Sequence, residues 1–227
     1  MSSDDARDDR ASPHVTSFFI VRHAESVANA GGYFGSQSDS PLSPLGEAQA
    51  ASLARALSKA RIDAIYASDL SRARRTIEAI AAQRALPIHE TALLRERSMG
   101  ELTGMTFADA AAKHPEVWTR LLARDPHVAP PGGETHVELA ARVTRFLAEA
   151  SALHRGRTVL VASHGGTIHH LVRQLLGVHD LALTFAMHVE NASVSRVDLL
   201  ARPGEPIVPR LLYVNRVAFD GPDLIER

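Results

Sequence analysis

Residues 16–23 read T-S-F-F-I-V-R-H, and this stretch decides the fold. The apolar run of residues 16–21 is short and rich in β-favouring side chains, which is typical of a strand buried on both faces of a sheet. The strand is expected to end at Arg22-His23. Ligands of parallel α/β sheets bind beyond the carboxyl ends of the strands, so this end predicts the position of a site.

Outward from this strand, strand-like and helix-like segments alternate along the chain. Further strands are expected at residues 62–67, 86–89, 158–162, 193–200 and 211–219. Helices are expected at residues 44–61, 70–85, 136–154 and 166–176, with start signals at Ser43, Ser68 and the capping-box pair Thr135 and Glu138. This alternation predicts an α/β fold, a single-domain three-layer α/β/α sandwich around a mostly parallel, mixed sheet.

Two segments differ from this pattern. Residues 1–14 are mostly polar and charged, which predicts a disordered tail before a domain at residues 15–227. Residues 100–133 contain Pro115, Pro126, Pro130 and Pro131, which allow short helices at most. An excursion of this kind between core elements predicts a lid over the site.

The composition argues against several classes of protein. The 227 residues carry 25 Lys and Arg against 26 Asp and Glu, a net charge of −1, so no nucleic-acid partner is expected. Without cysteine there is no disulfide, thiolate nucleophile or Cys-based zinc site. No apolar run reaches the roughly 18 residues of a membrane helix, and the polar N-terminus does not resemble a signal peptide. We therefore expect a cytoplasmic protein with no membrane partner.

Three expected strand ends bring charged and imidazole side chains to one edge of the sheet. The first delivers Arg22 and His23, the second is followed by Arg72, and the fourth ends at Ser163-His164-Gly165. Guanidinium and imidazole donors beside glycine-rich turns and helix N-termini suit a phosphate dianion. The residues thus predict an anion-binding site that contains a potential nucleophile.

A set of motifs in the order of a known family makes this prediction specific. Residues 22–29 read R-H-A-E-S-V-A-N, which resembles the R-H-G-E-S/T-x-x-N signature of the histidine phosphatase superfamily, the phosphoglycerate mutase-like family. Further motifs follow in that family's order: L-S-P-L-G at 42–46, S-D-L-S-R-A at 68–73, L-R-E at 94–96, P-G-G-E-T at 131–135 and S-H-G-G at 163–166. The resemblance spans about residues 15–200, with Ala24 in place of the usual glycine.

The resemblance implies a role for each side chain around the phosphate. His23 is implied as the nucleophile, which attacks phosphorus through a neutral nitrogen to form a phosphohistidine. Arg22, Arg72 and a protonated His164 are implied to hold the phosphoryl oxygens and stabilise the transition state. Further phosphate contacts are implied for Asn29 and Gly165.

The resemblance also implies that Glu96 is the general acid and base. This carboxyl would protonate the leaving alkoxide and then deprotonate the attacking water, a role that needs a raised pKa. Burial under a lid raises the pKa of a carboxyl, whereas nearby arginines lower it. Glu25 and Glu101 also lie near the site in the sequence and are the alternatives.

Hydrolysis is favoured over two alternatives. A cofactor-dependent phosphoglycerate mutase returns the phosphoryl group to its substrate, with bisphosphoglycerate as phosphoryl donor, and its lid carries an aromatic residue, a lysine and an arginine pair. Here Met99 and Phe107 stand at the aromatic and lysine positions, and no Arg-Arg pair follows. The second alternative is a non-catalytic phospho-ligand binding protein, although this chain keeps the candidate nucleophile His23. We therefore expect a phosphomonoester phosphatase that needs no cofactor, acts on a small phosphorylated metabolite and is a monomer or homodimer.

Three patterns are interpreted as having no function. Residues 31–35 (G-G-Y-F-G) are followed by no Gly-Lys-Ser/Thr, so they are not a nucleotide phosphate loop. His169 and His170 lack the H-E-x-x-H spacing of a zinc helix, and no metal is expected. Asn191-Ala192-Ser193 is taken as a chance glycosylation sequon, because a cytoplasmic chain does not meet the glycosylation machinery.

Overall fold

The computed structural model describes residues 12–181 and 187–217. Within these residues the strands form one six-stranded sheet in the order β3-β2-β4-β1-β5-β6. The strands are β1 (His14–Arg22), β2 (Ala64–Ser68), β3 (Ile88–Thr91), β4 (Thr158–Ser163), β5 (Ser193–Ala201) and β6 (Val208–Val217). Strands β3, β2, β4 and β1 pair in parallel, whereas β5 and β6 join antiparallel. The mostly parallel, mixed sheet is therefore confirmed.

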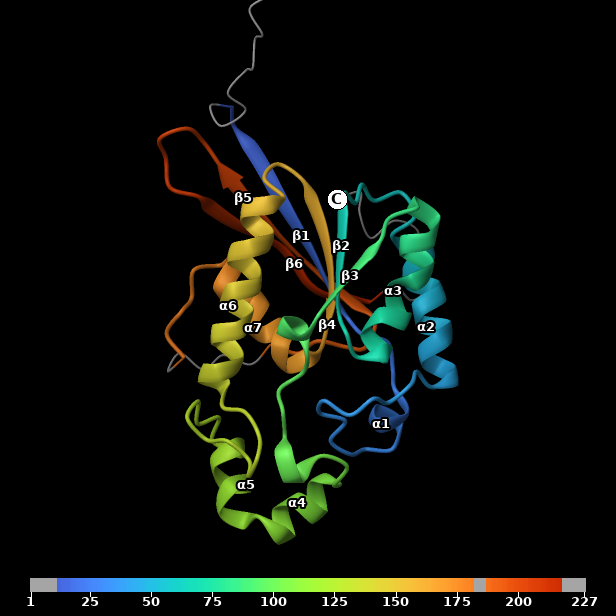
Figure 1. The fold of residues 1–227 in the computed structure, drawn as a ribbon, viewed down its shortest axis with the longest axis vertical. Coiled ribbons are helices and arrows are strands. Elements are labelled where there is room, and N and C mark those ends of the chain that lie inside the picture. The colour runs from blue at the N-terminus through green and yellow to red at the C-terminus, as the bar shows by residue number, and fades with distance from the viewer. Residues whose placement is uncertain (1–11, 182–186, 218–227) are drawn as a thin grey trace, which may run out of the picture.

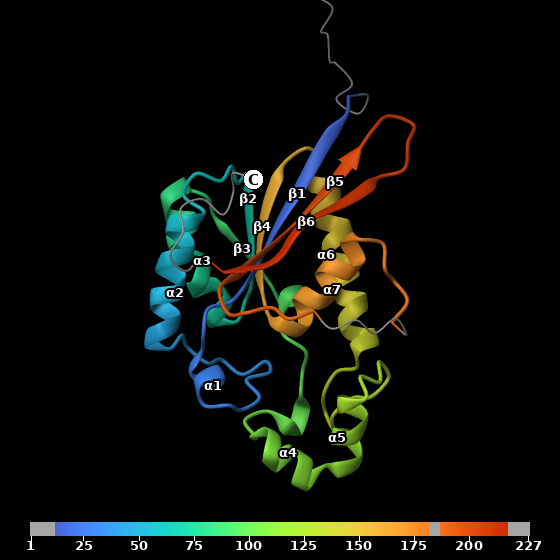
Figure 2. The same ribbon diagram turned by 180° about the vertical axis from the view of Figure 1, so that it is seen from behind.

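Helices cover both faces of the sheet (Figures 1 and 2). Helices α2 (Pro44–Ala56) and α3 (Ser71–Arg84) pack on one face, and α6 (His136–Leu153) and α7 (Gly165–Leu175) on the other. Alternate residues of β1 serve the two cores: Phe18 and Ile20 pack with α6 and α7, and Phe19 and Val21 pack with α2 and α3. This period of two is that of a strand buried on both sides, and the three-layer prediction is confirmed.

Two helix ends differ from the sequence prediction because distant side chains bind them. Helix α2 ends at Ala56 and not near residue 61. The Arg84 guanidinium donates to the carbonyls of Leu57 and Ala60, which a longer helix would have used for its own backbone hydrogen bonds. Ser68 is not the cap of α3. The N-cap is Leu70, and the carboxylate of Asp39 accepts from the backbone N–H of Ser71 at 3.1 Å.

The outer strands also shift from their predicted positions. Strand β3 covers Ile88–Thr91 rather than 86–89, because Ala85 closes α3 at a φ of 51° and Leu86 N–H bonds back to Ala81. Strand β6 begins at Val208, opposite Leu200, because the turn before it is shorter than expected. Its predicted end at residue 219 lies outside the described residues.

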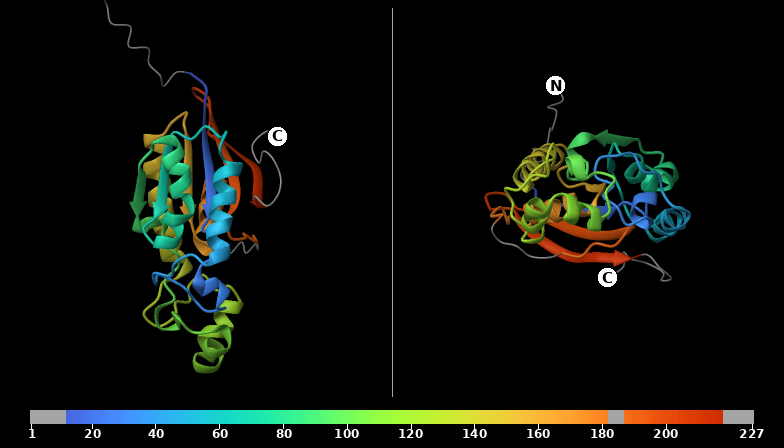
Figure 3. Two further views of the ribbon diagram at one scale, coloured as in Figure 1. Left: turned by 90° about the vertical axis from the view of Figure 1, so that its right-hand side faces the viewer. Right: turned by 90° about the horizontal axis from the view of Figure 1, so that it is seen from below.

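The segment predicted to be a lid lies at one end of the sheet (Figure 3). It contains the 3-10 helix η2 (Gly100–Leu102) and the short helices α4 (Phe107–Lys113) and α5 (Pro115–Leu122). The backbones at the two ends of the lid lie in close contact at Gly100 and Gly133. A side chain would not fit there, because a Cβ atom on Gly100 would lie 2.0 Å from the Pro131 carbonyl oxygen. Two further short helices, α1 (Val27–Ala30) and η1 (Ala92–Leu94), follow β1 and β3.

The start of the domain differs slightly from the predicted boundary. The sequence predicts a tail that includes His14, but His14 begins β1 and pairs with Ala201. Residues 1–11 of that predicted tail lie outside the described residues. Among the helices that the structure describes, none is both long and apolar enough to cross a bilayer.

Candidate active site

The two predicted histidines lie side by side at the ends of the central strands. Strands β1 and β4 are parallel neighbours that pair Arg22 with Ser163, and the N–H of His23 donates to the Ser163 carbonyl at 2.9 Å. The imidazole rings of His23 and His164 have their centroids 5.0 Å apart and are tilted by 54°. Both side chains are buried. The structure therefore brings these residues together as the strand ends predict.

The environment of His23 selects one tautomer. Its Nδ1 lies 2.7 Å from the carbonyl oxygen of Ala24. A carbonyl oxygen only accepts hydrogen bonds, so Nδ1 carries the proton and Nε2 keeps the lone pair. Burial, followed by the positive charges of Arg72 and Arg22, lowers the pKa of His23 well below its usual value. The imidazole is therefore neutral, as a nitrogen nucleophile requires.

Two arginines next to His23 are fixed by backbone carbonyls. Arg22 donates to the Val189 carbonyl at 2.5 Å, and Arg72 donates to the carbonyls of Ser36 and Ser38 at 2.7 and 2.8 Å. Burial lowers the pKa of both guanidinium groups. An arginine has five N–H donors, so each keeps donors for an anion beyond these structural bonds. Both arginines line one cavity together with the candidate residues His23, Asn29 and Glu96.

The environment of His164 bears on its expected charge. Burial, followed by the neighbouring His23 and Arg72, lowers the pKa of His164 well below the usual value, which opposes the protonated form that the resemblance implies. Both of its ring nitrogens are buried without a hydrogen-bond partner in the described structure. Buried unpaired polar atoms are costly and are concentrated at functional positions. Gly165, a predicted phosphate contact, lines the neighbouring cavity rather than the one that holds His23.

Glu96 is the acidic residue among those that line the His23 cavity. Its Oε1 accepts from the Arg97 N–H at 2.8 Å, and its Oε2 accepts from the Gly166 N–H at 3.2 Å, at the start of α7. The alternative Glu25 is instead bonded to the Ser43 hydroxyl at 2.6 Å. The other alternative, Glu101, is exposed and does not line the cavity. The geometry favours Glu96 among the three carboxylates.

Hydroxyl groups from β4 and α7 fix the backbone before Glu96. The Ser163 hydroxyl donates to the Leu94 carbonyl at 2.8 Å, and the Thr167 hydroxyl donates to the Arg95 carbonyl at 2.7 Å. The Glu96 carbonyl itself accepts from Arg142, which is paired with Glu134 in an ion pair that is mostly shielded from solvent. The segment that presents Glu96 is therefore tied to the same strand end that presents His164.

The structure adds one residue that sequence reasoning set aside. The amide of Asn191 donates to the His23 carbonyl at 2.9 Å and to the side-chain oxygen of Asn29 at 3.2 Å. That oxygen also accepts from the Ser26 N–H, so the Asn29 amide nitrogen is left for a ligand. Asn191 lies in an irregular segment, and its sequence signal was a sequon rather than a family motif. The Ala24 departure is accommodated, because its side chain packs in a small cluster with residues that include Leu42.

Apolar side chains from the lid and from two segments outside it also line the cavity. They are Phe107 of the lid, Met99 just before it, and Phe34 of the loop after α1. The rings of Phe34 and Phe107 meet edge to face, with centroids 4.8 Å apart. The two positions that distinguish mutases in the sequence therefore present apolar side chains to the cavity.

Comparison with known proteins agrees with this arrangement. A Shigella dysenteriae protein named as a probable phosphoglycerate mutase is 37% identical over 183 residues, which cover 79% of this chain and 83% of that protein. The metal-independent phosphoserine phosphatase of Arabidopsis thaliana is 32% identical over 197 residues, covering 86% and 81%. The structure of a mycobacterial glucosyl-3-phosphoglycerate phosphatase in complex with VO3 matches with a TM-score of 0.79 at 32% identity, covering 88% of this chain and 98% of that one.

The match extends over most of the chain. The family model of the histidine phosphatase superfamily (branch 1) matches residues 18–206, a range that runs from β1 to the turn before β6. The chain therefore belongs to the histidine phosphatase superfamily, whose members compared above carry the names of phosphatases and of a phosphoglycerate mutase.

Proposed function

We propose that the chain is a phosphomonoester phosphatase that works through a phosphohistidine on Nε2 of His23. The observation that carries this proposal is the neutral His23, with its Nδ1 proton bound to Ala24 and its Nε2 available beside Arg22 and Arg72. Nε2 attacks phosphorus as the bond to the leaving oxygen breaks, and the Glu96 carboxyl gives its proton to that oxygen. Water then attacks the phosphohistidine, its proton returns to Glu96, and phosphate leaves.

Charge stabilisation comes from the protein's own side chains in this proposal. Arg22 and Arg72 bind the equatorial oxygens, and an anion at the site would favour the charged form of His164 that the protein alone disfavours. The Asn29 amide adds a neutral donor. These groups take the role that a divalent metal has in other phosphoryl-transfer enzymes, so we propose that no metal or other cofactor is required.

Phosphate release is proposed in preference to the mutase reaction. Met99 and Phe107 stand at the two positions where a mutase grips a second anionic group, and both are apolar residues that line the cavity with Phe34. Two of the relatives compared above are named as phosphatases, of phosphoserine and of glucosyl-3-phosphoglycerate. The proposed substrate is accordingly a small phosphorylated metabolite that donates its phosphoryl group to water.

A panel of phosphomonoesters tests the proposal. Phosphoserine, phosphoglycerate, sugar phosphates and an aryl phosphate are each scored for released phosphate, and phosphoglycerate is also scored for isomerisation with and without bisphosphoglycerate. We expect phosphate release that persists after chelation of divalent metals. Isomerisation that outruns release assigns the mutase activity instead, and binding without turnover of any ester assigns a phospho-ligand binding protein.

A further inference from the structure

Ser36, in the loop after α1, has a backbone conformation that is unusual for a residue with a side chain. Its φ is 47°, in the left-handed region that favours glycine. The residue is also buried, and it lines the cavity that holds His23. Strain of this kind persists only where surrounding contacts outweigh its cost, and it is concentrated at functional sites. The contacts of the loop around Ser36 therefore bear on the function of the cavity.

The backbone of this loop holds Arg72. The carbonyls of Ser36 and Ser38 accept hydrogen bonds from its two terminal guanidinium nitrogens, at 2.7 and 2.8 Å. In the same loop, the carboxylate of Asp39 accepts from the Ser71 N–H at the start of α3, at 3.1 Å. The loop is thus bound to the helix that carries one of the two arginines proposed to bind the phosphate.

The side chains of the same loop hold the segment that carries Glu96. The Ser36 hydroxyl accepts from the Met99 N–H at 2.8 Å, and it lies 3.5 Å from the Arg97 carbonyl, the acceptor for its own proton. The side-chain amide of Gln37 donates to the Glu96 carbonyl at 3.0 Å. These bonds come from side chains, whereas the bonds to the arginine of α3 come from backbone carbonyls. A substitution can therefore remove the first set and leave the second.

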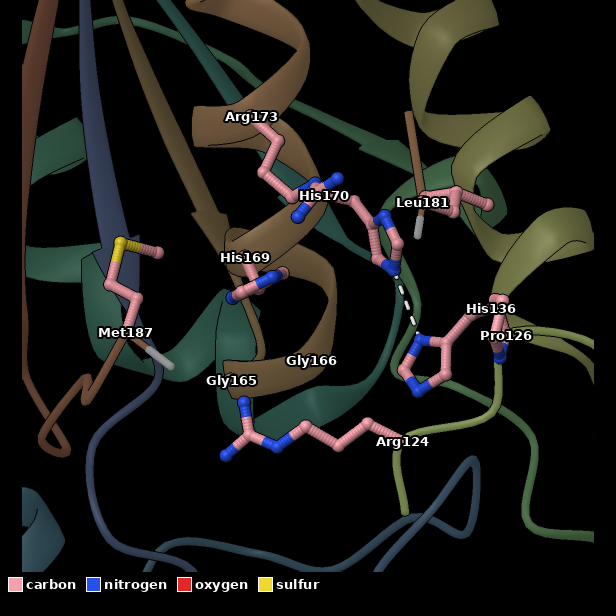
Figure 4. A pocket seen from close by; sticks show the side chains of 10 residues that line it. All are labelled: Arg124, Pro126, His136, Gly165, Gly166, His169, His170, Arg173, Leu181 and Met187. Carbon is pink, nitrogen blue, oxygen red and sulfur yellow. Dashed lines mark hydrogen bonds between the residues drawn. The ribbon is translucent and has the colours of Figure 1, made fainter. Parts of the chain in front are cut away.

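Glu96 lies between this loop and helix α7. Its Oε2 accepts from the N–H of Gly166, which Figure 4 labels beside Gly165 in the first turn of α7. A Cβ atom on Gly166 would lie 2.6 Å from Oε1 of Glu96, so the carboxylate packs directly against the backbone of the helix. Arg142 of α6 is a second donor to the Glu96 carbonyl, at 3.1 Å. Helix α7 thus contacts the carboxylate, while the loop and α6 hold the backbone that carries it.

We propose that Ser36 and Gln37 are positioning residues, which fix the Glu96 carboxyl relative to the phosphate site. One loop then sets the distance between the arginine that binds the phosphoryl oxygens and the acid that protonates the leaving oxygen. This inference rests on the proposed phosphatase function, because it gives the two side chains a task only if Glu96 is the acid. Proton transfer needs heavy atoms about 2.6–3.2 Å apart, so a small displacement of the carboxyl slows this transfer while anion binding is kept.

Two variants remove the side-chain bonds one at a time. Ser36→Gly removes the hydroxyl and leaves a residue that tolerates the positive φ, and Gln37→Met removes the amide at a similar size. In single turnovers, each variant should phosphorylate His23 from an alkyl ester about threefold to tenfold more slowly, the effect of one neutral hydrogen bond. An aryl phosphate, whose phenolate leaves without a proton, should lose much less. The inhibition constant of inorganic phosphate should stay unchanged, because both carbonyls that hold Arg72 remain.

Two control variants make the same changes away from the site. Ala85→Gly replaces another residue of positive φ, 51°, at the end of α3, and Gln83→Met replaces an exposed glutamine of the same helix. Helix α3 starts beside the site at Ser71, so its end lies about 20 Å from that start. Both controls should leave the two single-turnover rates unchanged. Melting temperatures show whether every variant keeps the fold.

Glu96→Gln is the reference that separates this inference from the proposed function. If Glu96→Gln slows the alkyl ester selectively, a Ser36 or Gln37 variant that slows neither ester, or both equally, overturns the positioning role and leaves the phosphatase intact. Weaker inhibition by inorganic phosphate together with equal losses means that the loop acts through Arg72, which also overturns it. If Glu96→Gln slows both esters equally, or no ester is turned over, the acid assignment and the positioning role fail together.

Discussion

The side-chain amide of Asn191 donates a hydrogen bond of 2.9 Å to the backbone carbonyl of His23, 168 positions earlier in the chain. The same carbonyl accepts from the Ala192 N–H at 3.2 Å. The segment before β5 therefore fixes the end of β1 at the residue that we propose as nucleophile. Through its second bond, to Asn29, Asn191 also orients the amide that is proposed to contact the phosphate.

Asn191→Ala should lower kcat/KM for a phosphomonoester by about tenfold, because each neutral hydrogen bond that it removes is worth roughly 0.5–1.5 kcal/mol. Asn191→Asp should lose more, since a carboxylate keeps the size of the amide but donates no hydrogen bond and repels a phosphate dianion. Steady-state kinetics measure both, and melting temperatures show whether the fold is intact. An alanine variant with wild-type kcat/KM contradicts the positioning role.

The sequence reveals residues at strand ends better than residues in irregular segments. Arg22, His23 and His164 are predictable because each ends or directly follows a buried strand, which a short apolar run of β-favouring residues reveals. Asn191 and Asp39 are not, because they act from irregular segments on partners far along the chain, and no local pattern encodes such a bond. The early end of α2 has the same cause, since it depends on the Arg84 side chain of another helix.

The sequence also does not reveal the environment that sets the charge of His164. A motif indicates the type of residue that stands near a phosphate, but burial and neighbouring charges set its protonation. The strand ends that predict the site also bury His164 completely and put it beside His23 and Arg72. This burial therefore opposes a positive charge on His164 in the protein alone.

Covalent labelling tests the proposed nucleophile. A labelled monoester quenched within one turnover should leave acid-labile, base-stable label on Nε2 of His23, because Nδ1 is bound to the Ala24 carbonyl. Mass spectrometry of the peptide and the phosphorus NMR shift of the phosphohistidine identify the residue and the nitrogen. His23→Ala should show no label, whereas His89→Ala, an exposed histidine on β3, is the matched control. Label on Nδ1, or label that persists in His23→Ala, rules out the assignment.

The buried histidines predict how stability depends on pH. In the native chain the pKa values of His136 and His170 are lowered to about 4 and about 3, whereas unfolded histidine titrates near 6.5. Below pH 6.5 the unfolded chain therefore binds more protons than the native one, and the free energy of unfolding falls as the pH falls towards 4. Each histidine that stays neutral in the native state contributes a slope of about 1.4 kcal/mol per pH unit.

Denaturant unfolding at several pH values between 7 and 4 measures this slope. His170→Gln removes one of the histidines that stay neutral in the native state, so its stability should fall less steeply with decreasing pH than that of the wild type. His89→Gln serves as the matched variant on the surface. Equal slopes for His170→Gln and the wild type would mean that His170 is already protonated in the native state.

Glu96 is the residue that we propose to protonate the leaving oxygen, and its replacement tests that chemistry separately from binding. Glu96→Gln keeps the size of the side chain and one acceptor oxygen, so either the Arg97 or the Gly166 bond persists. Esters of sugar or glycerate alcohols have poor leaving groups and should lose about a hundredfold or more, which is typical of a missing general acid. An aryl phosphate releases a stable phenolate and should lose much less in the phosphorylation of His23.

The informative quantity is the ratio of the two losses, measured in a single turnover before the attack of water limits the rate. In the proposed mechanism the attack of water also needs Glu96, as a base, so steady-state rates would show a loss for both substrates and hide the difference. Glu101→Gln changes an exposed carboxylate on the neighbouring lid, so it is the control and should leave both rates unchanged. Equal single-turnover losses for the alkyl and aryl esters would mean that Glu96 acts by holding the Gly166 end of α7 in position. In that case the proton would reach the leaving oxygen from another donor.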